Sequence, residues 1–180
     1  EFGPRALGSR SILADPRNEK MQKNLNLKIK FRESFRPFAP AIILEELNKW
    51  MDLDIESPYM LMVAEINKKL RLSLSENEKN LKGINKINVK RSIIPACTHV
   101  DNSARIQTVK ETKNKKFYKI IKNFFKITGC PILINTSFNV KNEPIVCTPE
   151  DAYNCVLNTD IDILVCGNSI IYKIKKNDFD

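Results

Sequence analysis

Apolar positions recur with two different spacings along this chain, and together they predict a domain in which helices and strands alternate. The clearest helix covers residues 114–128, whose apolar side consists of Phe117, Ile120, Ile121 and Phe124 at intervals of three and four. Lysines fill most of the remaining positions, as is typical of the solvated face of an amphipathic helix.

Shorter helices are predicted by the same pattern and by capping signals. They cover 17–28, 44–51 and a segment that begins at Thr148. Thr148 can cap the first turn, and Pro149 suits the first helical position, where no backbone N–H is needed.

Short apolar runs and prolines predict the strands. The extended segments are 29–44, 59–66, 93–100, 104–109 and 131–135, and two last runs, 161–166 and 169–174, flank a Gly167-Asn168 turn and predict a hairpin. Strands and helices therefore alternate, and they predict an α/β (α+β) domain with a mixed sheet.

Two segments do not follow these patterns. Residues 1–16 are punctuated by glycine and proline and predict a loop with a short strand; because they begin E-F-G-P-R without Met, we expect the chain to be part of a longer protein. Residues 72–92 are polar, rich in Asn and Lys and free of aromatics, so we expect a mobile surface insertion or lid there.

Composition excludes several classes of protein. No apolar run approaches the roughly 18 residues that a membrane span needs, so we expect no membrane partner. The five cysteines form no C-x-x-C motif, which favours reduced thiols in a cytoplasmic protein. With His99 as the single histidine, we expect no metal site in this chain. The net charge of +9 is compatible with an anionic ligand, but it also accompanies a general richness in Lys, Asn and Ile.

Lys30-Phe31-Arg32 is the first candidate for anion binding. In an extended segment Lys30 and Arg32 share one face and Phe31 points to the other, so we expect Phe31 to anchor the two cations from the core. Arg32 offers a planar fork for phosphate or carboxylate oxygens, and Lys30 a point charge. A solvated strand face explains this tripeptide equally simply.

Ser137-Phe138-Asn139 repeats the arrangement directly after the apolar run 131–135. Ligands of open α/β sheets bind beyond the carboxyl ends of strands, where this tripeptide falls. A hydroxyl and an amide there can orient a phosphate, although an ordinary Ser/Asn turn has the same composition.

Further candidates lie in and near 98–109. Ser103, Arg105 and Gln107 share one face of the predicted strand, and a buried arginine needs an anionic partner. His99 precedes them and fits either a structural hydrogen bond or catalysis. Weaker anion-binding candidates are Arg36, Arg5 and Arg10.

Five segments in order resemble one family, the O-carbamoyltransferases that modify nodulation factors, cephalosporins and aminoglycosides, in their C-terminal domain. The segments are E-F-G-P-R-A-L-G-S-R-S-I-L-A-D-P-R, K-F-R-E-S-F-R-P-F-A-P, H-V-D-N-S-A-R-I-Q-T-V, N-T-S-F-N and E-P-I-V-C-T-P-E-D-A, and they span nearly the whole chain. Single tripeptides are weak signals, but five ordered segments are specific.

The resemblance implies a YrdC-like twisted mixed β-sheet flanked by helices in residues 17–180, with 1–16 as a junction after an N-terminal Kae1-like domain. Such YrdC-like domains take carbamoyl phosphate and ATP, with Mg²⁺, to carbamoyl-adenylate. An iron-containing N-terminal partner domain, which we expect to be absent from this chain, then transfers the carbamoyl group to an acceptor hydroxyl.

The family's K-x-R and S-x-N tetrad matches Lys30, Arg32, Ser137 and Asn139, which the resemblance implies are catalytic and, together with Arg36, bind ATP. It implies that carbamoyl phosphate is bound by Arg105, His99 and Arg5.

One departure from the family pattern is Asn102, where relatives are expected to have Gly. Asn tolerates a left-handed backbone, so we expect the turn to persist.

Two other functions remain open from the residues alone. The charge and the lysine-rich helix suit a module that binds RNA or nucleotides, although no RNA-binding signature is present and we do not expect a nucleic-acid partner. A non-catalytic docking domain is the other alternative.

Overall fold

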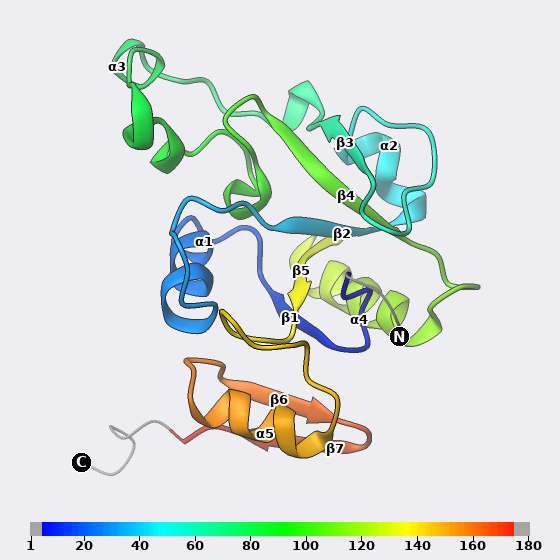
Figure 1. The fold of residues 1–180 in the computed structure, drawn as a ribbon. Coiled ribbons are helices and arrows are strands. Elements are labelled where there is room, and N and C mark those ends of the chain that lie inside the picture. The colour runs from blue at the N-terminus through cyan, green and yellow to red at the C-terminus, as the bar shows by residue number, and fades with distance from the viewer. Residues whose placement is uncertain (1–4, 175–180) are drawn as a thin grey trace.

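The computed structural model describes residues 5–174, and its centre is a mixed five-stranded sheet. The strands are β1 (Ser11–Ala14), β2 (Ala39–Ile43), β3 (Met62–Glu65), β4 (Ser103–Val109) and β5 (Ile132–Ser137), in the spatial order β1-β5-β2-β4-β3 (Figure 1). β2 runs parallel to β4, and the other neighbours are antiparallel. The predicted α/β class with a mixed sheet is confirmed.

Helices cover both faces of this sheet. On one face α4 (Lys115–Thr128) buries Phe117, Tyr118 and Ile121 against β2, β4 and β5. On the other face α1 (Met21–Asn24), the π-helix η1 (Leu25–Ile29) and α5 (Pro149–Leu157) contribute to the larger core cluster. The two clusters alternate along β1, β2 and β5, because successive side chains point to opposite faces.

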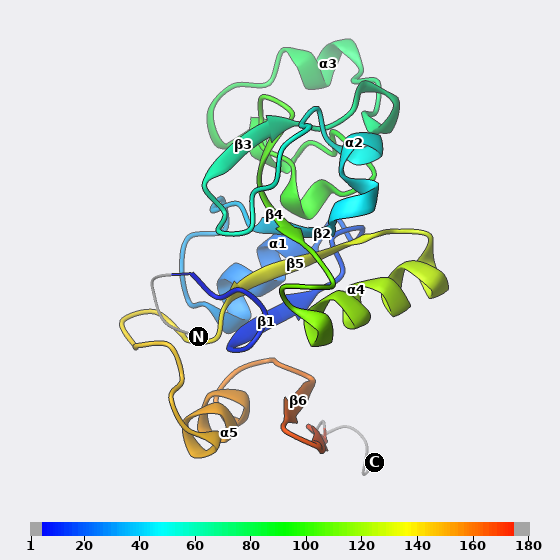
Figure 2. The same cartoon turned by 90° about the vertical axis from the view of Figure 1, so that its right-hand side faces the viewer.

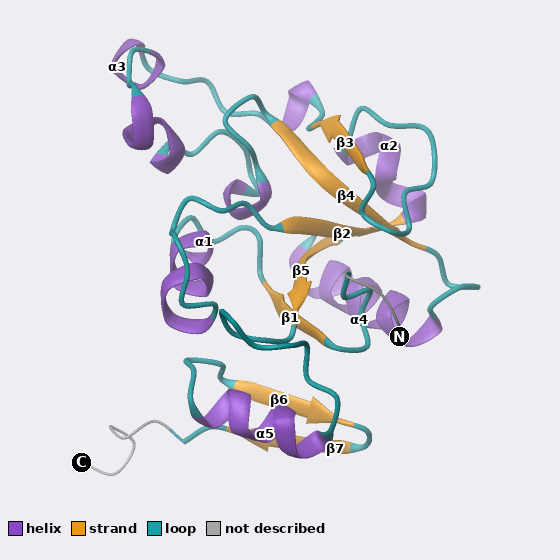
Figure 3. Ribbon diagram, viewed as in Figure 1, coloured by secondary structure: helices purple, strands orange, loops and turns teal. Residues whose placement is uncertain are grey.

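The C-terminal hairpin forms a second, two-stranded sheet. β6 (Ile163–Cys166) and β7 (Ser169–Tyr172) pair across the predicted turn, where Gly167 has φ 60°. With α5 they form a layer below the five-stranded sheet (Figures 2 and 3). The hairpin prediction is confirmed.

Two helices begin where capping chemistry predicts. The Asn114 side chain accepts from the backbone N–H of Phe117 at the start of α4, and Gly129 ends the helix with φ 71°. At α5, Thr148 and Asp151 form a capping box with Pro149 in the first turn. The predicted segment 44–51 becomes a 3₁₀ turn, η2 (Leu44–Glu46), followed by α2 (Leu47–Trp50).

Two predictions of local structure are wrong. The helix expected over 17–28 starts at Met21 and continues as the π-helix through Ile29, so the extended segment does not begin at residue 29. Residues 93–100 contain the 3₁₀ turn η5 (Pro95–Cys97) instead of a strand. Pro95 lies in the first turn of that helix, where its fixed φ is favourable and its missing N–H is not needed.

Residues 72–92 form a closed excursion from the sheet. They contain α3 (Glu76–Lys79), capped by Ser75, and the 3₁₀ segment η4 (Gly83–Asn88). The excursion follows η3 (Lys68–Leu70), and its two ends meet where the Leu72 N–H donates to the Arg91 carbonyl at 2.8 Å. Within residues 5–174, no helix has the length and apolar character to cross a membrane.

Candidate functional site

Lys30 is buried at the carboxyl end of β5, with 4% of its surface exposed. Its Nζ donates to both oxygens of Ser137, at 2.8 Å (carbonyl) and 3.2 Å (Oγ), and to both oxygens of Asn139, at 2.7 Å (carbonyl) and 2.6 Å (Oδ1). An ammonium has three protons, and here four oxygen atoms share them. Lys30 therefore holds Ser137 and Asn139 in place.

The electrostatics of Lys30 follow from its burial. Burial and, to a smaller extent, the Arg32 charge lower the pKa of Lys30 to about 8. The four oxygen acceptors favour the charged form and act in the opposite direction. At neutral pH the group is an ammonium without a carboxylate counterion among the residues described.

Arg32 is held by contacts different from those of Lys30. Its Nε donates to Asn26 Oδ1 at 2.7 Å, and its guanidinium carbon lies 5.0 Å from the centre of the Phe38 ring. Burial, and then Arg36, lower the pKa of Arg32. Its two terminal nitrogens carry no hydrogen bond within residues 5–174, so they can meet an anion.

The expected geometry of Lys30-Phe31-Arg32 is wrong in one respect. Phe31 has φ 48° and is 48% exposed, so it is not the aromatic anchor. The chain leaves η1 at Lys30 in helical conformation and then turns through Phe31, and strand alternation does not apply there. Phe38 takes the place of the anchor, with 3% exposed. At the second tripeptide Phe138 is buried, as alternation predicts.

His99 belongs to a second polar group, at the start of β4. The Ser103 hydroxyl donates to Asp101 Oδ1 at 2.7 Å, so it accepts from His99 Nδ1–H at 2.9 Å. Burial lowers the pKa of His99, Asp101 raises it and Arg105 lowers it further. His99 is therefore a neutral imidazole at pH 7 with the Nε2 lone pair available. The turn that precedes Ser103 places Asn102 at φ 66°, the left-handed conformation predicted for it.

Arg105 extends this group along β4. Burial and the charge of Arg5 lower the pKa of Arg105. Neither arginine forms an ion pair with a carboxylate of the described residues, so two cations lie near each other without neutralisation. The resemblance assigned His99, Arg105 and Arg5 to one ligand, and the structure brings them together.

The strand register connects the two groups. Asn135 pairs with Ala39 of β2, and Gln107 pairs with Ala41, so the small β2 residues let Asn135 Nδ2 reach Gln107 Oε1 at 2.6 Å. Ser137 lies two residues beyond Asn135 on the same face. Because β5 runs opposite to β2 and β4, Ser137 and the residues before Gln107 lie at one end of the sheet, two strand spacings or roughly 10 Å apart.

The remaining predicted residues lie at the margin. Arg36 is exposed and pairs with Glu33 at 2.9 Å, close enough to influence Arg32. Arg10 donates to the Val146 carbonyl at 3.2 Å and so braces the loop before α5. Of the segment E-F-G-P-R, residues 1–4 lie outside the described range.

Sequence reasoning missed two buried asparagines. Asn26 orients Arg32, and no sequence signal marks it, because the contact arises from the turn after η1. Asn135 lies two residues before Ser137 in N-T-S-F-N, so alternation would have placed it on the face of Ser137. Gln107, its partner, was already placed on the face of Arg105.

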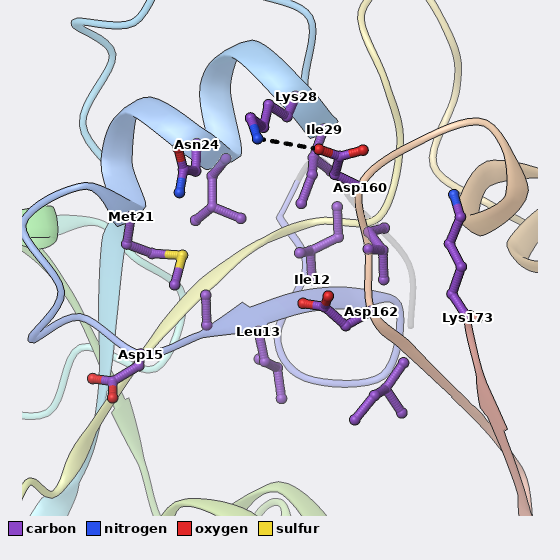
Figure 4. A pocket seen from close by; sticks show the side chains of 14 residues that line it. Ile12, Leu13, Asp15, Met21, Asn24, Lys28, Ile29, Asp160, Asp162 and Lys173 are labelled. Carbon is purple, nitrogen blue, oxygen red and sulfur yellow. Dashed lines mark ion pairs between the residues drawn. The ribbon is translucent and has the colours of Figure 1, made fainter. Parts of the chain in front are cut away.

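Two cavities lie on the described surface. One, of about 610 Å³, is lined by Phe31, the loop 140–147 and α5, next to the Lys30 group. The other, of about 680 Å³, lies between α1, β1 and the segment before β6, where Lys28 faces Asp160 at 3.5 Å (Figure 4). None of the four tetrad residues lines either cavity, but Phe31 and Val140, their neighbours in sequence, line the first. No group of three or more His, Cys, Asp or Glu residues among 5–174 could hold a metal ion.

Comparison with known proteins finds relatives over almost the whole chain. The chain is 56% identical to an uncharacterised protein of Synechocystis, 42% to the nodulation protein NolNO of Sinorhizobium fredii, and 32% to the 3'-hydroxymethylcephem-O-carbamoyltransferase of Amycolatopsis lactamdurans. The matches cover 96%, 96% and 94% of this chain. They cover 28%, 23% and 28% of those proteins, so the chain spans about a quarter of their length.

The profile of the family described as "Carbamoyltransferase C-terminus" matches residues 1–173. The match includes every residue of both polar groups and the strands that align them. The resemblance seen in the five sequence segments is thereby confirmed, and this chain belongs to the carbamoyltransferase C-terminal family.

Proposed function

We propose that this chain binds ATP and carbamoyl phosphate and joins them as carbamoyl-adenylate. The observation that carries the proposal is the alignment of two cationic groups at one end of the sheet, roughly two strand spacings apart. Two polyanions repel each other, and bringing them together requires cations placed in advance. The Lys30–Arg32 group and the Arg105–Arg5 group provide these cations.

The reaction needs placement of charge more than a nucleophilic side chain. Carbamoyl phosphate is hydrolysed to carbamate and phosphate, and a carbamate oxygen then attacks the α-phosphorus of ATP. A new C–O–P link forms, the α–β phosphoanhydride bond breaks, and pyrophosphate leaves with the bond electrons. Mg²⁺ would accompany ATP as part of the substrate.

The residues divide this work in the proposal. The Arg32 terminal nitrogens and the Ser137 and Asn139 side chains contact the ATP phosphates, and Lys30 keeps Ser137 and Asn139 positioned. The cavity beside Phe31 has room for the rest of the nucleotide. Arg105 and Arg5 bind the phosphate of carbamoyl phosphate, while neutral His99 offers Nε2 to the attacking water or to the carbamoyl group.

Transfer to an acceptor hydroxyl belongs, in this proposal, to the part of the longer relatives that the chain does not match. We expect that part, with its iron, to be a Kae1-like domain and the natural partner of this chain in the cytoplasm. Relatives named "nodulation protein" and "O-carbamoyltransferase" indicate glycan-like or antibiotic acceptors as the class to test.

The test measures pyrophosphate release by the chain alone and by a chimera with the remainder of the Synechocystis relative. Release should require both ATP and carbamoyl phosphate, and Lys30→Ala and Ser137→Ala should abolish it. Lys119→Ala, on the exposed side of α4, controls for general loss of positive charge. Release that persists in both tetrad variants would show that the tetrad is wrongly assigned.

A further inference from the structure

Asn135 carries an unpaired buried acceptor between the two cationic groups. Within residues 5–174 its Oδ1 is the one buried side-chain oxygen or nitrogen that has no hydrogen-bond partner. The residue is 1% exposed. A buried polar atom without a partner is rare, because it loses its hydration and gains nothing in return.

The orientation of this amide is fixed by its other end. Asn135 Nδ2 donates to the Ala6 carbonyl at 3.0 Å and to Gln107 Oε1 at 2.6 Å. A flipped amide would direct its oxygen at these two oxygen atoms, which repel it. The oxygen atom of the amide, and not its nitrogen, is therefore the atom without a partner.

The position of Asn135 relates it to both groups. Ser137 is two residues away on the same face of β5, and Gln107, its hydrogen-bond partner, is two residues from Arg105 on the same face of β4. A molecule that extends from Arg105 towards Ser137 passes this amide. Such a molecule must carry a hydrogen-bond donor in order to pair with Asn135 Oδ1.

We propose that Asn135 Oδ1 accepts a hydrogen bond from the carbamoyl NH₂ and so selects carbamoyl phosphate over acyl phosphates of the same size. The inference rests on the proposed function. Carbamoyl phosphate and acetyl phosphate share their phosphate and carbonyl groups and differ in NH₂ against CH₃. A methyl group leaves the acceptor unpaired, and sites with a buried unpaired polar group reject such analogues strongly.

The N-terminal segment packs against the Asn135 amide. Ala6 is 3% exposed, and three side-chain amides hold the segment: Asn135 on the Ala6 carbonyl, and Gln107 and Asn114 on the Leu7 carbonyl at 3.3 and 3.2 Å. The carbamoyl group reaches Oδ1 when residues 5–7 are displaced, and their return would keep the carbamate from bulk water.

The first measurement compares the wild-type chain on two substrates. Pyrophosphate release with ATP is measured with carbamoyl phosphate and with acetyl phosphate, alone and in the chimera described above. We expect a preference of at least about a hundredfold for carbamoyl phosphate. Equal use of both would overturn the role of Asn135 while leaving adenylate formation intact. No release with either would reject the proposed function itself.

The second measurement removes the acceptor. Asn135→Leu should reduce the preference by at least about tenfold, chiefly through slower use of carbamoyl phosphate. Gln107→Met loses the same side-chain hydrogen bond, and also the one from Gln107 Nε2 to the Leu7 carbonyl, but it keeps Asn135 Oδ1, so its preference should equal that of the wild type. A preference unchanged in Asn135→Leu, or equally reduced in Gln107→Met, contradicts the proposal. If Asn135→Leu does not fold, which circular dichroism reports, equal use of the two substrates by the wild type still overturns the proposal.

Discussion

The two cationic groups at the end of the sheet differ in what surrounds their charge. Lys30 is buried and fully engaged, with four oxygen atoms of Ser137 and Asn139 around its ammonium. Arg105 is half-buried beside Arg5 and has no carboxylate among the described residues to neutralise it. The donors of Lys30 are engaged within the protein, whereas neither Arg105 nor Arg5 pairs with a carboxylate of residues 5–174.

The difference between Lys30 and Arg105 distinguishes a cation that positions neighbouring side chains from a cation that can bind a ligand. A cation whose donors are all engaged stabilises the fold and fixes its neighbours, so its removal should cost stability and activity together. A cation that faces another cation costs stability until a ligand arrives, so its removal should cost activity alone. The following predictions test this division.

Lys30→Met should have the largest effect, because it removes the buried ammonium that four oxygen atoms of Ser137 and Asn139 share. We expect the free energy of unfolding to fall by about 3 kcal/mol and pyrophosphate release to fall by at least about a hundredfold. Denaturant titration and the release assay measure the two. Lys28→Met, which removes an exposed lysine paired with Asp160 at 3.5 Å, is the control and should change both little. Full stability in Lys30→Met would contradict a positioning role.

Arg105→Met should reduce activity without reducing stability. We expect the concentration of carbamoyl phosphate for half-maximal release to rise about a hundredfold, since a charge-assisted contact to the phosphate is lost. Unfolding free energy should stay within about 0.5 kcal/mol or rise, because the repulsion with Arg5 is relieved. Arg17→Met, whose guanidinium pairs with Asp15 at 2.6 Å, is the matched control. Strong destabilisation by Arg105→Met would show that this arginine has an internal partner.

Gly8→Ala tests the segment that brings Arg5 to Arg105. Gly8 has φ 123°, and a Cβ there would lie 2.6 Å from the Phe117 ring, which is 1% exposed and cannot retreat. We expect a loss of about 2 kcal/mol or displacement of residues 5–8, with weaker carbamoyl phosphate binding. Calorimetry and thermal unfolding measure these. Gly83→Ala also has a positive φ, 57°, but meets nothing within 4 Å, and should cost about 1 kcal/mol or less.

The smallest effect concerns pH. The pKa of Lys30 is about 8 in the folded chain against an ordinary value near 10.5. Between these values the unfolded chain binds a proton that the folded chain has released, so the contribution of Lys30 to stability rises with pH. From pH 8 to 9 the unfolding free energy of the wild type should rise relative to Lys30→Met by about 1 kcal/mol. A difference that stays constant over this range would contradict the lowered pKa.

Local chemistry made part of the fold predictable. α4, the start of α5 and the C-terminal hairpin follow from periodicity, capping residues and the Gly167 turn, and each lies where predicted. The left-handed Asn102 was predictable for the same reason, because its conformation depends on its own side chain. Predictions failed at η1, where the helix continues as a π-helix, and at the 3₁₀ turn before His99, where Pro95 favours a helical first turn over a strand.

In the candidate site, too, some features could be predicted from the sequence and others could not. The pairing of K-x-R with S-x-N came from the resemblance to a family, and the hydrogen bonds of Lys30 to Ser137 and Asn139 agree with it. Phe31 was misplaced because its backbone conformation depends on how η1 ends, which no alternation pattern records. Asn26 and the unpaired oxygen of Asn135 were not predictable, since both are defined by residues far away in sequence.

The sequence by itself determined the class of fold, the family and the residue types available for an anionic substrate, because these depend on local pattern and on motifs in order. The tertiary structure decided which cations have partners among residues 5–174 and which, like Arg105, have no ion pair there. That distinction depends on antiparallel pairing of β5 with β2 and parallel pairing of β2 with β4, which place Ser137, Asn135 and Arg105 at one end of the sheet. Burial distinguishes Lys30, which is enclosed by its acceptors, from half-buried Arg105, and burial arises only when the core has assembled.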